Sequence, residues 1–218
     1  STNYQRDGLY KNGLYATNSY GKSENVHFEN FGFKGVLTYK ITGRQFLTFN
    51  GAHMTKAPSM RNTFNNARLN NNIVGNLQSE RVSSLDASYI INAPKFKMRL
   101  TGYMTKSKNA TNNTFFYAEG AFEEDESGDG SDAFVGQTTT NIAKKNIGVE
   151  FGGEYNITST LKATVAASYG QYTYDNNPNV TLTNDANASA DNTNPIIDFG
   201  KSYLKDYRQA GAPQQAYS

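Results

Sequence analysis

Six segments of this chain alternate apolar and polar side chains with the period of two that is typical of β-strands. In the first segment, Phe33 and Leu37 fall on one side, and Lys34 and Thr38 fall on the other. Each run is about nine or more residues long, close to the roughly 9–11 residues that a tilted strand needs to cross a bilayer. Globular strands usually have about five or six residues. The pattern predicts strands near 31–41, 46–54, 82–91, 96–105, 147–157 and 161–174.

The connections between these segments alternate between short turns and long polar stretches. This alternation is typical of bacterial outer-membrane barrels, which have tight periplasmic turns and large extracellular loops. Structureless connections longer than about 12–15 residues are uncommon in compact soluble domains. We therefore interpret residues 1–218 as part of one all-β domain, an antiparallel transmembrane β-barrel. The short turns lie at 42–45, 92–95 and 158–160, and the expected extracellular loops lie near 1–25, 55–81, 106–146 and 175–202.

Charged residues occupy the polar side of the later segments: Lys97, Arg99, Glu150, Glu154 and Lys162. A Lys or Arg that faced lipid would cost roughly 2–4 kcal/mol near the bilayer midplane. We therefore expect this side to face the lumen. The five lumenal side chains are expected to form charge pairs that fix contacts between strands and with a plug.

A tyrosine precedes each of the three short turns by three residues. Tyr39, Tyr89 and Tyr155 all fall on the apolar side of their segments. Aromatic residues at one level beside short turns are typical of the aromatic girdle of a membrane barrel, because their amphipathic rings favour the membrane–water interface. The three tyrosines are therefore predicted to form such a girdle.

Composition narrows the classes of function. Only 37% of the 218 residues are apolar and the mean hydropathy is −0.68, yet 15 residues are Tyr and 13 are Phe. The chain has no Cys and a net charge of +2 without a basic stripe, so we expect no disulfide, no thiolate metal site and no nucleic-acid partner. It also lacks a long apolar run and an export signal. The first rules out a helical membrane protein, and the second means that the signal was removed or that the chain is a fragment.

Six strands cannot close a transmembrane barrel, since the smallest such barrels have eight. We therefore expect a fragment of a larger barrel. Several stretches resemble the later part of the barrel of TonB-dependent outer-membrane receptors, in the subgroup with an N-terminal carboxypeptidase-regulatory-like domain. These stretches are 57–68, 70–72, 77–80, 93–97, 100–103 and 169–180.

The resemblance implies a 22-stranded barrel in the outer membrane of a Gram-negative bacterium, with a plug inside it. It also implies energised import of a scarce solute, driven by a periplasmic TonB-type energy transducer that pulls on an N-terminal segment. That segment and the plug are not in this sequence. The other expected contacts are outer-membrane lipid, the unknown substrate, and an outer-membrane lipoprotein or larger complex. No cofactor is expected.

One predicted loop has polar groups dense enough for ligand recognition. Arg61, Asn65, Arg68 and Asn71 are its candidate ligand-binding residues, since Arg can bind carboxylate or phosphate in a fork and amides both donate and accept hydrogen bonds. The alternative is that the same groups pack the loop on the plug or on neighbouring loops. The substrate class is open, because iron chelates, glycans and peptides all fit a polar lumen.

No catalytic or metal-binding residue is predicted. His27 and His53 stand alone, and the acidic run from Glu119 to Asp132 does not have the spacing of a calcium loop, so we expect a solvated loop and keep calcium as the alternative. Three other functions remain open: a structural or accessory subunit of a larger outer-membrane complex, a small lipid-modifying outer-membrane enzyme, and a secreted β-sandwich adhesin. The enzyme would need clustered Ser, His or acidic groups, and no such cluster is evident.

Overall fold

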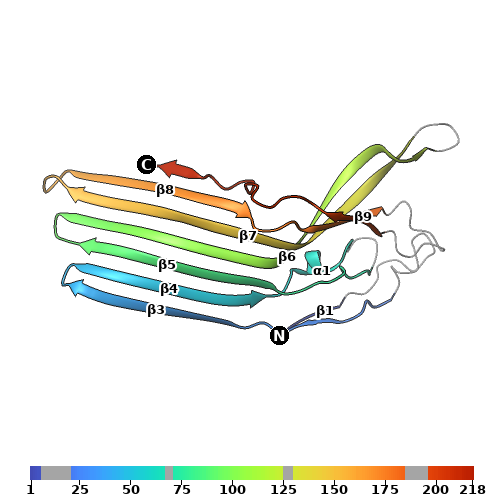
Figure 1. Cartoon of the computed structure of the whole chain (residues 1–218), viewed down its shortest axis with the longest axis horizontal. Helices are drawn as coiled ribbons and strands as arrows, with labels where there is room; N and C mark the ends of the chain where they lie inside the picture. Colours follow the sequence, from blue (N-terminus) through green and yellow to red (C-terminus); the bar gives the residue numbers. More distant parts are fainter. Residues whose placement is uncertain (6–20, 67–70, 125–129, 185–195) are drawn as a thin grey trace.

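The computed structural model describes residues 1–5, 21–66, 71–124, 130–184 and 196–218, and in these the chain is almost entirely β-structure (Figure 1). Three long hairpins form the body of one antiparallel sheet. They are β3 (Gly32–Thr42) with β4 (Gln45–Lys56), β5 (Glu80–Asn92) with β6 (Phe96–Glu124), and β7 (Gly130–Asn156) with β8 (Lys162–Tyr174).

Neighbouring hairpins pair in sequence order. The main sheet runs β10-β9-β7-β6-β5-β4-β3, and β8 also pairs with β7. Strand β7 is long enough to pair with two partners, since β8 covers its 144–156 part and β9 (Asn179–Asn184) covers its 135–140 part. Strand β10 (Ile196–Lys201) continues the sheet beyond β9, and β11 (Gln215–Tyr217) lies on the other side of β8.

The short turns all lie at one end of the sheet and the long connections lie at the other (Figure 1). Side-chain hydroxyls hold two of the turns, because Thr42 Oγ1 accepts from the Arg44 amide (3.2 Å) and Thr158 Oγ1 accepts from the Leu161 amide (2.9 Å). Such hydroxyl contacts are typical of turns. The six predicted strands and their antiparallel pairing are thus confirmed.

The prediction of a loop over 106–146 was wrong. Strands β6 and β7 continue through most of it, paired from Asn112 with Thr139 to Ala118 with Ala133, after register shifts between Ser107 and Ala110 and between Ala110 and Asn112. This part escaped prediction because its apolar residues do not alternate with polar ones: Phe115, Phe116 and Tyr117 are consecutive within an otherwise mostly polar stretch. Two further strands of six residues each, β9 and β10, lie in the predicted loop near 175–202.

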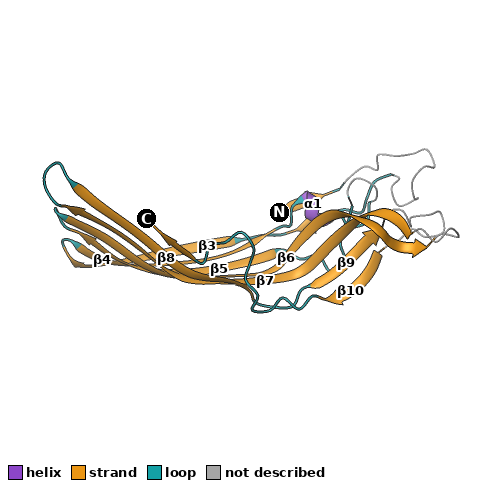
Figure 2. Ribbon diagram, turned by 90° about the horizontal axis from the view of Figure 1, so that it is seen from above, coloured by secondary structure: helices purple, strands orange, loops and turns teal. Residues whose placement is uncertain are grey.

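The predicted loop near 55–81 contains a short helix, α1 (Met60–Thr63), whose N-terminus is capped by the Ser59 side chain. The chain near the N-terminus forms a small separate sheet of β1 (Thr2–Tyr4) and β2 (Val26–Phe28). Figure 2 shows the main sheet as a curved surface with α1 on one side of it.

The described residues do not form a closed barrel. Strand β3 pairs only with β4, and beyond β7 strand β8 pairs only with the short β11. The confirmed fold is therefore a large antiparallel sheet of long strands with two open edges.

Candidate functional site

One face of the three hairpins is apolar from strand to strand. Directly paired residues share a face, so the register defines rows that cross the sheet. One row contains only apolar residues and glycine: Leu37, Phe49, Ala87, Gly102, Val149 and Tyr169. The next row toward the short turns repeats this composition: Tyr39, Leu47, Tyr89, Leu100, Phe151 and Ala167.

Large apolar side chains on this face are exposed. Leu37 is 66% exposed, Leu85 is 59% exposed and Val149 is 49% exposed. In β5 the polar residues Ser84, Asp86 and Ser88 on the other face are more covered, and Ser88 is only 1% exposed, whereas β3 is exposed on both faces. Soluble domains bury their apolar side chains and rarely expose a large continuous apolar surface. This exposed apolar face is the reverse of what is found in a soluble domain, and we therefore call the sheet inside-out.

The polar face carries a ladder of hydroxyl groups. Ser88 and Thr101 are linked Oγ to Oγ1 at 2.9 Å, and Arg99 Nη2 donates to Ser88 Oγ at 3.3 Å. Nearer the long connections, Asn50 Nδ2 donates to Asp86 Oδ1 at 2.6 Å. Because these bonds join neighbouring strands, the polar side chains on this face satisfy one another across the sheet.

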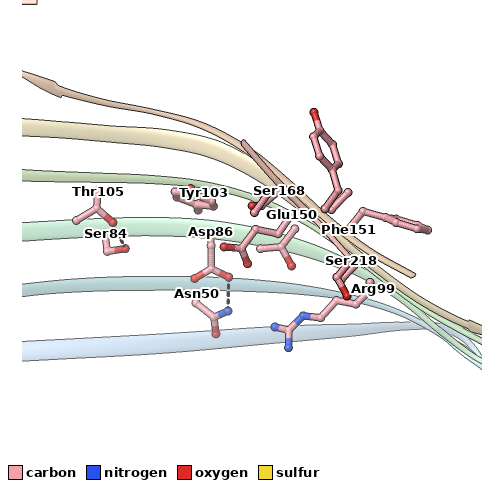
Figure 3. Close-up of a pocket in the computed structure, with 16 residues that line it drawn as sticks. Asn50, Ser84, Asp86, Arg99, Tyr103, Thr105, Glu150, Phe151, Ser168 and Ser218 are labelled. Atoms are coloured by element: carbon pink, nitrogen blue, oxygen red, sulfur yellow. Dashed lines mark hydrogen bonds between the residues drawn. The ribbon is translucent and has the colours of Figure 1, made fainter. Parts of the chain in front are cut away.

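A hollow of about 760 Å³ lies on this face. Figure 3 shows the carboxylates of Asp86 and Glu150, the guanidinium of Arg99 and the ring of Tyr103 around it. The last three residues, 216–218, form one side of the hollow. With two carboxylates and one guanidinium, it is a polar site of mixed charge.

Tyr103 lies flat across the adjacent strands next to this hollow. Its hydroxyl is 2.6 Å from the hydroxyl of Tyr172, two strands away. A Cβ atom at Gly148 would lie 2.6 Å from the Tyr103 hydroxyl, and one at Gly170 would lie 2.9 Å from it. The two glycines therefore leave the space in which the tyrosine ring fits, and the hydroxyl pair connects β6 to β8.

All five charged residues predicted to be lumenal lie on the polar face, by the register of their strands. Glu154 Oε2 pairs with Lys162 Nζ at 3.2 Å, and its Oε1 pairs with Lys97 Nζ at 3.9 Å. Arg99 and Glu150 border the hollow. The expected charge pairing is thus present around Glu154, while the assignment of this face to a lumen stays a prediction.

The three predicted girdle tyrosines all lie on the apolar face. Tyr39 and Tyr89 share one cross-strand row through Leu47, whereas Tyr155 lies four residues nearer the short turns than Phe151, which continues that row. From the first hairpin to the third, the short turns are displaced in the same direction as the tyrosines. Such a stagger is expected of strands tilted to a barrel axis, in which a row perpendicular to the strands does not stay at one height.

The four predicted ligand-binding residues do not form one exposed group. Asn65 is 2% exposed and its Oδ1 accepts from Thr138 Oγ1 at 3.4 Å, while Asn71 Nδ2 donates to the Gly21 carbonyl at 3.0 Å. Arg61 has an exposed side chain, and Arg68 lies outside the described residues. The amides at positions 65 and 71 therefore pack the loop.

Sequence reasoning missed the residues that organise this loop. Asn113 Nδ2 donates to the carbonyls of Arg61 (2.9 Å) and Phe64 (2.8 Å), and Asn62 Nδ2 donates to the Thr111 carbonyl (2.8 Å). Beneath them, Phe64, Val74 and Val135 are almost completely buried. Lone apolar residues within the polar segments were the only available signal.

The described residues do not bring together a group of metal ligands. Within the described part of the chain, no three His, Asp or Glu side chains come together as a metal site, and no helix is long and apolar enough to cross a membrane. His27 is near Asn3 and Glu29, and His53 Nδ1 is 2.9 Å from Ser83 Oγ. The side chains of the acidic run from Glu119 to Asp132 lie outside the description.

Comparisons with protein-family models, with curated proteins and with solved structures found no match to this chain.

Proposed function

We propose that this sheet is part of the wall of a TonB-dependent outer-membrane receptor, with its apolar face against lipid and its polar face toward the lumen. The observation that carries this proposal is the inside-out sheet. Full burial of one large apolar side chain stabilises a protein by about 1.5–3 kcal/mol relative to leaving it in water. A face that leaves so many such side chains exposed is understandable if lipid covers it.

The dimensions of the apolar band support the same proposal. In β7 the band runs from Ile147 to Tyr155, which is about 26 Å along the strand at about 3.3 Å per residue. Transmembrane barrels have an outward apolar band about 25 Å tall, and strand tilt reduces the height that a given length covers. The band is therefore of the size required to cross most of a bilayer.

The two open edges fit a wall that continues on both sides. Unpaired backbone N–H and C=O groups are costly in a bilayer, so membrane sheets are closed. We therefore propose that further strands pair with β3 and continue the sheet on the far side of β8, beyond β11. The number of strands expected from the resemblance is 22, and the plug would occupy the lumen.

In this proposal the receptor binds a scarce solute on the long-connection side and admits it when a periplasmic TonB-type transducer acts on the plug. The wall itself performs no chemistry. An accessory role in a larger outer-membrane complex is the second candidate. It is favoured by one observation: the predicted ligand loop uses Asn65 and Asn71 for internal packing, as a rigid docking surface would.

Single cysteines provide the test of the wall, because this stretch has no Cys of its own. Val149→Cys and Glu150→Cys would be made in the full-length protein in intact cells, since the two neighbours lie on opposite faces. We expect a membrane-soluble maleimide to label position 149 and a polar maleimide to label position 150. Labelling of position 149 by the polar reagent alone would refute the lipid-facing assignment.

The receptor role has its own test. Cells that lack the full-length protein and cells that lack the energy transducer should lose uptake of the same solute. Normal uptake without the transducer, with a stable complex retained in the absence of substrate, would instead support the accessory role.

A further inference from the structure

The apolar face changes character at its long-connection end. The row beyond the apolar band begins with Phe33, His53 and Ser83 and continues with Lys106, Lys145, Thr173 and Arg208. In the next row, Arg81 is paired with Lys108. Five basic residues therefore follow the apolar band on the same face. We call Arg81, Lys106, Lys108, Lys145 and Arg208 the basic belt.

The belt places like charges directly opposite one another. Lys106 faces Lys145, and Arg81 faces Lys108. Such pairs destabilise a sheet unless an anion compensates them. The ion pairs within the described residues involve Glu29 or Glu154, and neither contacts the belt. Among the described residues, the carboxylates of Glu80, Asp175 and Asp206 form no ion pair with a belt cation.

A second hollow, of about 780 Å³, lies where the belt meets the apolar band. Lys145 and Arg208 border it on the basic side together with Asp206, and Ile147 and Tyr169 provide apolar lining. The segment that contains Arg208 follows the edge of β8, where the Gln209 amide donates to the Tyr172 carbonyl at 2.9 Å. The hollow thus combines an apolar surface with cations at one end.

We propose that the basic belt and this hollow bind a glycolipid of the outer leaflet whose headgroup carries more than one phosphate. The acyl chains would lie on Ile147 and Tyr169, and the phosphates would contact Lys145, Lys106 and Arg208. Lys106 and Arg208 are three strand spacings apart, about 14 Å at about 4.8 Å per spacing. One phosphate cannot bridge that distance, whereas a headgroup with separate phosphates can. This inference rests on the proposed function, which places the long connections on the outer side.

The test uses the full-length receptor in uncharged detergent and measures bound lipid by native mass spectrometry. The probes are bis-phosphorylated lipid A, its dephosphorylated form, phosphatidylglycerol and inorganic phosphate. The test variants are Lys106→Gln/Lys145→Gln and Arg208→Gln. The matched control is Lys97→Gln/Lys162→Gln, which removes two lysines from the polar face near the short turns.

We expect wild type to retain the bis-phosphorylated lipid most tightly. Each removed belt charge should weaken retention roughly fivefold, so about 25-fold for the double variant, and the control should change it less than twofold. The double variant should unfold at the same or a higher temperature than wild type without lipid, since a repulsive pair is gone. Added lipid A should stabilise wild type more than the double variant.

Equal retention of the dephosphorylated form, or unchanged retention by the double variant, would overturn the inference. Equal retention of phosphatidylglycerol or of inorganic phosphate would overturn the assignment to a glycolipid. If the cysteine labelling gives the expected faces while lipid A does not bind, this inference alone fails. If the full-length protein is soluble without detergent, the proposed function fails first.

Discussion

The two ends of the sheet distribute apolar side chains in opposite ways. Between the short turns and the basic belt, apolar residues such as Leu37 and Leu85 are exposed, while the polar Ser88 on the other face is covered. Beyond the belt, Phe64, Val74 and Val135 are buried beneath a polar loop, as in a soluble domain. The chain therefore has two patterns of burial: apolar side chains are exposed on one part of the sheet and buried in the other. We refer to these patterns as the two burial rules.

Under the proposed function, this difference reflects two solvents. Where water surrounds a sheet, apolar groups must be covered by other parts of the protein. Where lipid surrounds it, the apolar face needs no protein cover, and polar groups instead must satisfy one another, as Asn50 and Asp86 do. The basic belt lies where one rule gives way to the other.

The largest effect is expected from a charge on the apolar face. Leu100→Arg changes the middle of the five apolar positions of β6, and Thr101→Arg places the same charge one residue along, on the polar face. We expect Leu100→Arg to lower the free energy of unfolding in a bilayer by about 2–4 kcal/mol. Urea titration of the folded barrel, followed by gel mobility, measures it.

Thr101→Arg is the matched control. It removes the 2.9 Å contact with Ser88 Oγ, so a loss of about 1 kcal/mol is expected. Equal losses for the two variants would mean that both faces meet the same solvent, and the inside-out interpretation would then fail.

The alternation of side chains predicted the six strands near the short turns because one face there is apolar and the other is polar. It did not predict that β6 continues to Glu124 and that β7 begins at Gly130, because the apolar residues of that stretch, such as Phe115 and Phe116, are adjacent and do not alternate with polar ones. The sequence also did not predict which side chains contact each other across neighbouring strands. Asn50 and Asp86 are 36 residues apart, and only the register of β4 on β5 places them together.

The next effect concerns packing on the polar face. Gly148→Ala would place a Cβ atom 2.6 Å from the Tyr103 hydroxyl and 2.7 Å from the Tyr169 carbonyl oxygen. Because the second contact is with backbone, relaxation is limited, and we expect a loss of about 1–3 kcal/mol of unfolding free energy. The same urea titration applies.

Gly152→Ala is its control, on the same strand and the same face, with no atom within 4 Å of the added carbon. It should be neutral or raise stability by up to about 1 kcal/mol. If both alanines are tolerated equally, the fit of the Tyr103 ring over Gly148 is not a determinant of the wall.

A local effect is expected in the water-exposed half. Asn113→Ala removes the donor to the Arg61 and Phe64 carbonyls and leaves them without that partner in a buried setting. An unsatisfied buried polar group costs about 1–3 kcal/mol. The loop around α1 should therefore become more sensitive to protease, whereas the urea transition of the lipid-level strands should change little.

Asn112→Ala provides the comparison, since Asn112 is exposed and lies one residue away. Its protease sensitivity should match wild type. A loss of stability throughout the barrel on Asn113→Ala would show that the two halves unfold as one unit.

The smallest effect concerns the ion pairs of Glu154, next to the short turns. Glu154→Gln removes the contacts with Lys162 and Lys97, whose side chains are 54% and 58% exposed. Exposed ion pairs contribute about 0–1 kcal/mol, and salt screens them. We therefore expect a decrease in unfolding free energy of less than about 1 kcal/mol at low salt, which disappears at high salt. Glu24→Gln removes an exposed carboxylate that has no ion pair among the described residues and should show no salt-dependent decrease. A larger, salt-independent loss at Glu154 would mean that this end of the polar face is shielded from water, and the boundary between the two burial rules would then extend to the short turns.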